Sequence, residues 1–324
     1  VYKAPNFILN GEIYVPLYEG KMIWHYNHHY GIWPTSGERP NTISTPPLDE
    51  LTDPNSSIIP WYWVPQSEVE NRLVKTDKDG NIIWKWEHKW MITYRGLTNA
   101  TNERTFICSP IPDAIGVGNS STVIFADCGA MPVAIFLSMV SSLIFDYAVR
   151  QKVGGTNMST YFVKQFPVLT FEQIPDKAKP LIIERVAELC YFNHDLYGWI
   201  NELWYDEEMT DDIRKAMLVR LAECNGLCFD NDSLANPDFS NVQPYIYNEE
   251  RRAVAQAELD AIIAHLYGLT TEELRYILDP EDVCGKGCIN ETFRVLKERE
   301  LRELGEYRTK RLVMEAWNKF KFDN

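Results

Sequence analysis

The chain has 324 residues and a mass of 37.6 kDa, which is enough for two domains with sizeable cores. With 45% hydrophobic and 24% charged residues it has the composition of a globular protein, which excludes a disordered chain. Its net charge of −14 argues against a uniformly basic nucleic-acid binder.

The charge is unevenly distributed along the chain. Residues 1–170 contain 13 Lys and Arg against 15 Asp and Glu, a net of −2, whereas residues 171–324 contain 19 against 31, a net of −12. We therefore expect an anionic second half and a first half that can form a local basic face. Seven cysteines with no evident disulfide framework indicate a reducing, cytoplasmic environment.

Short strand signals and loops alternate over the first 130 residues. The segment Leu17–Gly31 holds three of the six histidines, which suit either a metal site or surface and packing positions. The second interpretation is favoured, because no Cys, Asp or Glu follows at ligand spacing. Residues 34–60 are rich in Pro, Ser, Thr, Asn and Asp and are predicted to be a loop. A hairpin turn is predicted at Lys78–Asn81, and strands are predicted over Trp61–Pro65, Ile82–Trp86, Phe106–Pro110 and Thr122–Phe125.

A helix is predicted over Pro132–Arg150 and a strand over Thr160–Phe166, with a glycine-bearing turn between them. The apolar window Met131–Val149 contains three serines and Asp146, so it is typical of a buried helix and not of a membrane span.

The rest of the chain has helical periodicity. Thr270 and Glu273 have the spacing of a capping box, and Gly305 divides the last two helices. A loop is expected over Leu227–Tyr247. Helices are predicted over Phe171–Leu203, Asp211–Cys224, Glu249–Tyr267, Asn290–Leu304 and Tyr307–Phe320. The expected fold class is α+β, with a strand-rich domain at residues 1–170 and a helical domain at residues 171–324.

Two pairs of cysteines, Cys224/Cys228 and Cys284/Cys288, have a CxxxC spacing. This spacing fits a zinc site or ordinary positions on one helix face, and the second interpretation is favoured because zinc sites more often use CxxC.

Two stretches combine cations with short polar side chains. Tyr94–Thr105 holds two arginines, two asparagines and three threonines, and Phe145–Pro167 holds Arg150, Lys152 and Lys164 around a Gly154-Gly155 pair. Arg and Lys suit phosphates, whereas Asn and Thr suit base edges. The alternative is a pair of solvated turns. The side chains of these stretches that could contact phosphates or base edges are those of Arg95, Asn99, Asn102, Arg104, Lys152, Thr156, Asn157 and Lys164; DNA as their ligand is what the family resemblance described below implies.

Catalytic signatures are missing from the sequence. It contains no Asn/Asp-Pro-Pro-aromatic motif of an aminomethyltransferase, no Walker loop, no GxSxG, no HExxH and no nuclease triplet of two acids and a lysine. No catalytic residue, cofactor site or metal site is therefore predicted in this sequence.

Six segments, taken together and in order, resemble the C-terminal portion of large adenine-specific DNA methyltransferases of restriction–modification and phage-defence systems. The ordered set carries the resemblance, since each segment alone is only moderately specific. The segments are Leu17–Gly31, Trp61–Leu73, Tyr94–Pro112, Phe145–Leu169, Arg252–Asp279 and Phe293–Trp317. The Phe145–Leu169 segment is also similar to the end of target-recognition domains in the specificity subunits of multi-subunit restriction enzymes.

The resemblance implies a cytoplasmic target-recognition region that grips double-stranded DNA while the methyltransferase core of the parent chain flips the adenine. It places the catalytic motifs and S-adenosylmethionine in that core, so this region would read DNA without catalysing methylation. Whether the parent also cleaves DNA is left open.

Two other interpretations remain at this stage. The acidic helical half can instead be an interaction module that docks on the methyltransferase core or a partner subunit without contacting DNA. A stand-alone hydrolase is a third, less supported interpretation.

Overall fold

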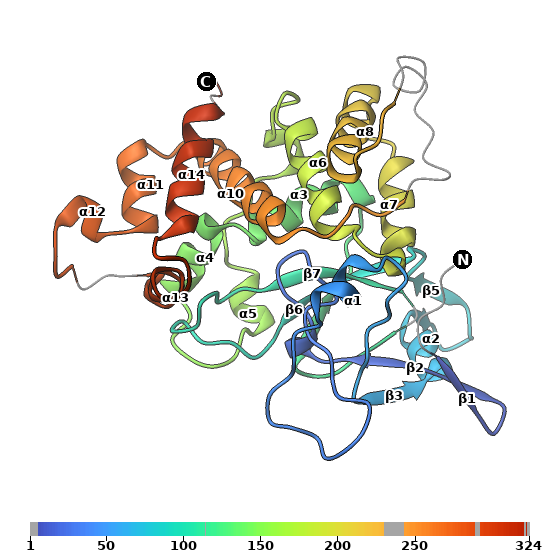
Figure 1. Cartoon of the computed structure of the whole chain (residues 1–324). Helices are drawn as coiled ribbons and strands as arrows, with labels where there is room; N and C mark the ends of the chain where they lie inside the picture. Colours follow the sequence, from blue (N-terminus) through green and yellow to red (C-terminus); the bar gives the residue numbers. More distant parts are fainter. Residues whose placement is uncertain (1–5, 114, 230–242, 289–291, 321, 323–324) are drawn as a thin grey trace.

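Small sheets occupy one end of the molecule and helices are packed against them, which is the mixed α+β architecture expected from the sequence (Figure 1). This computed structural model describes residues 6–113, 115–229, 243–288, 292–320 and 322.

Two sheets organise the strand-bearing part. In the first, β2 (Glu12–Tyr18) pairs antiparallel with β1 (Phe7–Leu9) and β3 (Tyr62–Pro65), and β8 (Gly116–Val117) joins its end in parallel. In the second, β6 (Trp90–Arg95) lies between β7 (Cys108–Pro112) and β9 (Ser121–Ile124), antiparallel to both. The aromatic and β-branched side chains of β6 are buried up to Tyr94, as suits a central strand.

Short elements surround these sheets. The 3-10 helix η1 (Gly20–Met22) follows β2, and α1 (Leu48–Thr52) interrupts the segment predicted to be a loop. Beyond α2 (Gln66–Arg72), the predicted hairpin is confirmed as β4 (Val74–Thr76) and β5 (Ile82–Lys85). The Asp77 carboxylate closes its turn by accepting hydrogen bonds from the backbone amides of Asp79 (2.9 Å) and Asn81 (2.8 Å).

The helix predicted over Pro132–Arg150 is two helices, α3 (Ala130–Val140) and α4 (Leu143–Arg150), bent by 61°. Ser142 caps α4, where its hydroxyl accepts a hydrogen bond from the Phe145 amide. Asp260, far along the chain, accepts a hydrogen bond from the Leu143 amide at 2.7 Å. These two caps satisfy amides that a continuous helix would have bonded to its own backbone.

The strand predicted over Thr160–Phe166 is wrong, because Thr160–Val163 forms the short helix α5. Phe162 and Val163 on α5 are half-buried, and Phe166, which follows the helix, is buried. The β-branched and aromatic composition of the segment was therefore misleading, since no neighbouring strand pairs with it.

The predicted helix over Phe171–Leu203 is broken into separate elements. These are η2 (Phe171–Gln173), α6 (Lys179–Cys190), η3 (His194–Leu196) and α7 (Tyr197–Trp204). Asn193 caps η3 by accepting a hydrogen bond from the Asp195 amide, which ends the helical run after α6.

Apart from α12 (Glu281–Cys284), which lies within a segment expected to be a loop (Asp279–Gly287), the remaining helices follow the predicted pattern. The capping box is confirmed, since the Thr270 hydroxyl accepts from the Glu273 amide at 3.2 Å and Glu273 accepts from the Thr270 amide at 2.8 Å. Gly305 ends its helix with a φ of +75°, which favours glycine. Most of the predicted Leu227–Tyr247 loop lies outside the described residues. The elements are α8 (Asp211–Asn225), α10 (Glu249–Leu266), α11 (Thr271–Leu278), α12 (Glu281–Cys284), α13 (Arg294–Leu304) and α14 (Arg308–Lys319).

Ion pairs to the buried carboxylates of Glu188 and Glu258 hold α6, α10 and α14 together. Arg185 Nε lies 2.8 Å from Glu258 Oε2, Arg251 Nε lies 3.0 Å from Glu188 Oε1, and Lys319 Nζ lies 2.7 Å from Glu258 Oε1. The hydrophobic core itself runs continuously from the sheets into these helices through α3, which packs on both α6 and β7. The strand-bearing part and the helical part thus share one core. The division into two domains at residue 170 therefore stays a prediction.

In the described part of the chain, no single helix is both long and apolar enough to cross a membrane. Among the described residues, α3 and α4 reach that length and apolarity only when taken together, and the two helices are sharply bent at the break between them.

Candidate nucleic-acid interface

The structure brings the two predicted segments together. Leu97 and Asn157 form an antiparallel bridge, the Thr98 amide donates to the Thr156 carbonyl at 2.9 Å, and the Met158 amide donates to the Gly96 carbonyl at 2.8 Å. Residues 95–104 and 150–164, which are separate in the sequence, therefore form one continuous surface, here called the recognition face.

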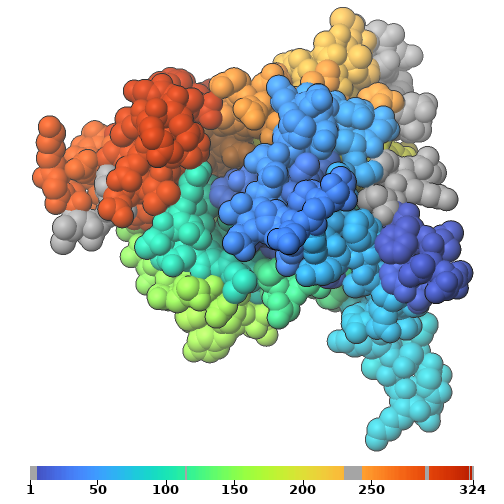
Figure 2. Space-filling view, turned by 60° about the horizontal axis from the view of Figure 1, so that its bottom comes forward, coloured from blue at the N-terminus to red at the C-terminus, as the bar shows by residue number. Residues whose placement is uncertain are grey.

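Most of the predicted contact residues are exposed on this face. Asn102, Lys152, Thr156, Asn157 and Lys164 are all exposed. Neither lysine forms an ion pair with any residue that the structure describes, so both ammonium groups are available to an anion. In Figure 2 the yellow-green atoms of residues around 160 stand out from the surface beside the teal atoms of residues around 100.

The glycine pair lies on the same face. A Cβ built on Gly154 or Gly155 would meet no atom within 4 Å, and neither residue has the positive φ that would demand glycine. The fold itself therefore gives no reason for glycine at these two positions. An absent side chain does expose the backbone amides to a close approach by another molecule. Beside them the Tyr161 ring is 73% exposed.

The loop that carries Asn99 and Asn102 is held in place from within. The Asn99 side-chain oxygen accepts hydrogen bonds from the Thr101 amide (2.9 Å) and hydroxyl (3.0 Å), so it is used by the turn. The Thr98 hydroxyl closes the base of the loop by donating to the Thr105 carbonyl. Asn102 projects from this framework with its side chain exposed.

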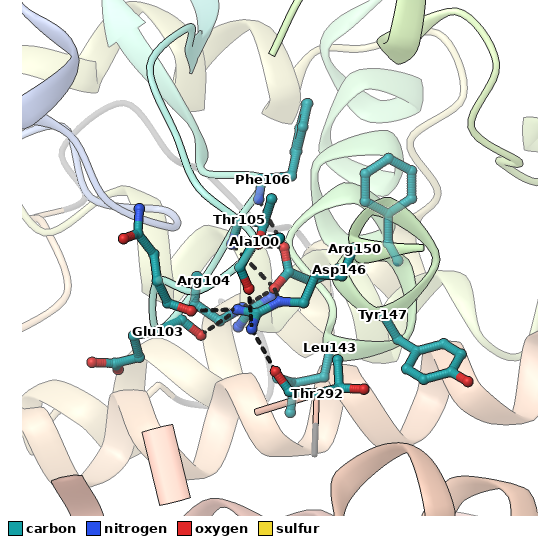
Figure 3. Close-up of polar contacts among 12 residues, drawn as sticks. Ala100, Glu103, Arg104, Thr105, Phe106, Leu143, Asp146, Tyr147, Arg150 and Thr292 are labelled. Atoms are coloured by element: carbon teal, nitrogen blue, oxygen red, sulfur yellow. Dashed lines mark hydrogen bonds and ion pairs between the residues drawn. The ribbon is translucent and has the colours of Figure 1, made fainter. Parts of the chain in front are cut away.

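Arg150 is the main anchor of the loop (Figure 3). Its guanidinium donates to the carbonyls of Ala100 (3.2 Å), Asn102 (2.8 Å) and Glu103 (2.7 Å), and also to that of Thr292. Because one planar guanidinium donates hydrogen bonds to the carbonyls of three loop residues, it holds those three residues in one conformation.

A buried carboxylate orients that arginine. Asp146 is fully buried and lies 3.1 Å from Arg150 Nε, one helical turn away on α4. It also accepts hydrogen bonds from the amides of Thr105 (3.0 Å) and Phe106 (2.7 Å), at the point where the loop returns to the sheet (Figure 3). Sequence analysis missed Asp146 as part of the site, although its spacing of four residues from Arg150 on a predicted helix is a signal for a side-chain pair.

Arg104 is removed from the predicted interface. Its side chain is buried, with 8% of the residue exposed, and it donates to the Ser141 carbonyl at 2.7 Å. It also lies 3.4 Å from Asp146, so its charge is balanced inside the protein. A guanidinium in that position cannot reach a phosphate outside, and its role is structural.

Arg95 is also engaged by the protein. Its guanidinium lies 4.9 Å from the centre of the Trp24 ring and 5.7 Å from that of Tyr30, and it donates to the Ile23 carbonyl. Burial lowers the pKa of Arg95 to about 10. This residue fixes β6 against residues 23–30 and is not the exposed cation that the sequence suggested.

The loop is also tied to the helical half. Glu103 binds Arg299 of α13 through two hydrogen bonds, of 2.9 Å from Nε and 2.8 Å from Nη2. This two-point pairing is the geometry in which an arginine positions a carboxylate most strictly. Together with the Arg150–Thr292 contact, it makes the loop's position depend on residues near the C-terminal end of the chain.

The histidine-rich segment is packed inside the protein. His25, His28 and His29 are all buried, and burial holds the pKa values of His25 and His28 well below the usual range. His28 Nε2 lies 3.9 Å from Asp195 Oδ2, and burial raises the pKa of Asp195 to about 8. No group of His, Cys, Asp and Glu within the described ranges is arranged to hold a metal ion.

Comparisons of the chain with protein-family models, with curated proteins and with solved structures gave no match.

Proposed function

We propose that this chain is the DNA target-recognition region of a cytoplasmic adenine-specific DNA methyltransferase. The observation that carries the proposal is the convergence of the Gly96–Asn102 loop with residues 152–164 into one exposed, hydrogen-bonded surface. These are two of the segments on which the resemblance to that family rests. The methyl donor S-adenosylmethionine and the catalytic residues belong to the methyltransferase core of the parent chain.

The side chains of the recognition face divide into two chemical roles. Lys152 and Lys164 bind backbone phosphates, since both are exposed cations without an ion-pair partner among the described residues. Thr156, Asn157 and Asn102 lie between or beside them and supply the donors and acceptors that read base edges.

The recognition face differs in charge from the rest of the protein. In Figure 2 its yellow-green segment and the cyan hairpin β4–β5 project at separate places on the same side of the molecule. The recognition face carries no exposed acid of its own between residues 150 and 165, although the chain as a whole is strongly anionic. A local cationic surface on an anionic protein restricts DNA to one place and one orientation.

A titration of fluorescent duplex DNA at several salt concentrations tests the proposal. For the double variant Lys152→Ala/Lys164→Ala we expect weaker binding and a slope of log Kd against log salt that is smaller by about 2, because two phosphate contacts are lost. The matched control is Lys215→Ala/Lys286→Ala, which removes two exposed lysines of the helical half. Equal losses in the two double variants would show only a general charge effect and would contradict the proposal.

A further inference from the structure

A groove on the helical side of the molecule has the features of a second docking site. It has a volume of about 820 Å³ and lies between α3, η2 and the turn that follows α7. The recognition face contributes none of its lining. Its role is therefore separate from DNA recognition and needs an explanation of its own.

The floor of the groove is apolar and partly open. Pro132 and Phe136 on α3 are half-buried, as are Phe171 of η2 and Leu169 just before it. Tyr205, at the end of α7, is 62% exposed at the margin. These side chains form an apolar strip that nothing in the described chain covers, which is typical of a surface that receives a partner.

The rim of the groove is acidic. Five carboxylates line it and no lysine or arginine does; they belong to Glu172, Glu202, Asp206, Glu207 and Glu208.

Two of these carboxylates are fixed by the fold. Glu202 accepts hydrogen bonds from the Lys89 amide (2.7 Å) and the Trp90 indole (2.8 Å). Asp206 accepts one from the Met131 amide at the start of α3 (2.9 Å). Glu172 is engaged by the Thr170 side chain and lies near Lys179, and the His88 ring contacts Glu202 at 2.6 Å. Glu207 and Glu208 are exposed and form no ion pair with any residue that the structure describes, so their carboxylates are open to a cationic partner.

We infer that this groove binds an amphipathic helical segment of a partner protein whose apolar face is flanked by lysine or arginine. The charge complementarity selects the occupant: the acids repel nucleic acid and acidic peptides, while the apolar strip needs an apolar anchor that a simple cation lacks. Helix-in-groove binding uses this combination of an apolar stripe and charged margins. Such a segment would join the anionic half to another protein without using the recognition face.

A fluorescent peptide provides the test, with the full chain and two probes. The first is a helical peptide of leucine and lysine with one apolar face; the second has the same composition in an order that gives no apolar face. We expect the first to bind at low salt and the second to bind about tenfold more weakly, because only the first can fill the apolar strip.

Three variants locate the binding. Glu207→Lys/Glu208→Lys reverses the free rim charges and should weaken binding of the first peptide about tenfold. Phe136→Ala should weaken it too, by removing part of the floor. The matched control is Glu38→Lys/Asp79→Lys, an equal charge change at two exposed acids outside the groove, which should leave binding unchanged.

Three outcomes would overturn the inference. They are equal binding of the two peptides, an equal loss in the control variant, and full displacement of the peptide by spermidine, which would indicate a site for small cations. None of them depends on DNA binding, so they leave the proposed function untouched.

Discussion

The pair Glu103–Arg299 offers a test in which charge and geometry predict opposite results. Glu103→Gln removes a negative charge from the recognition face, so electrostatics alone predicts tighter binding of DNA. Arg299→Ala removes a positive charge and by the same reasoning predicts weaker binding. If the pair instead positions the loop, both substitutions should weaken binding, because each removes the same contact between the loop and α13.

The size of the effect follows from the geometry and exposure of the pair. Two hydrogen bonds join the side chains, which are 26% and 34% exposed, so solvent screens part of the attraction. A partly exposed two-point pair of this kind has a coupling energy of about 1 kcal/mol. If losing the pair lets the loop leave its binding conformation, the full coupling energy of about 1 kcal/mol is lost from DNA binding. Each single variant should then bind DNA about fivefold more weakly.

The assay is DNA titration of the two single variants and the double variant. The double variant should bind about as weakly as either single variant, since the interaction can be lost only once. The salt dependence should remain that of the wild type, because neither side chain touches phosphate. Opposite changes in affinity for Glu103→Gln and Arg299→Ala would refute a positioning role.

Three further predictions concern the framework and the surface. Asp146→Ala should lower the free energy of unfolding by about 3 kcal/mol in urea denaturation, because it leaves Arg150 charged and unpaired inside the protein; a loss below 1 kcal/mol would contradict its role as an anchor. Gly155→Val should leave the melting temperature nearly unchanged, since the site is open, but should weaken DNA binding by blocking the backbone; unchanged binding would remove the glycines from the interface. Burial raises the pKa of Asp195 to about 8, so the folded protein keeps a proton that the unfolded chain releases near pH 4, and this carboxyl's contribution to stability falls as the pH rises between these values. The buried histidines His25, His28 and His29, whose pKa values burial lowers, contribute the opposite slope below about pH 6.5. In urea denaturation Asp195→Asn should therefore lose less stability than the wild type between about pH 6.5 and 8, while the part due to Asp260, whose pKa burial raises to about 7, remains in both proteins; equal slopes would show that Asp195 is already ionised.

The sequence was most informative where the determinants of structure are local. The capping box at Thr270 and the helix end at Gly305 depend on a few consecutive residues, and both were predicted correctly. The turn at Lys78–Asn81 is of the same kind, since Asp77 and Gly80 close it without help from elsewhere.

Predictions failed where a distant residue decides the local structure. The break between α3 and α4 depends on Asp260, which caps Leu143 from 117 positions away. Thr160–Val163 has strand-like composition, but among the described residues no strand pairs with it, and it forms the short helix α5.

The candidate site shows the same limit. Arg104 and Lys152 look equally accessible in the sequence, but one is buried against Asp146 and the other is exposed. Local composition cannot distinguish them, because burial is set by which helix packs over the loop. The anchoring role of Arg150 was equally hidden, since its partners are backbone carbonyls that carry no sequence signal.

The most direct measurement of the central claim is protection of individual lysines from acetylation by bound duplex DNA, read by mass spectrometry. The account predicts that DNA shields Lys152 and Lys164, while Lys215 and Lys286 on the helical half are modified at the same rate with and without it. Equal modification of all four lysines in the presence of saturating DNA, or shielding confined to the helical half, would contradict it.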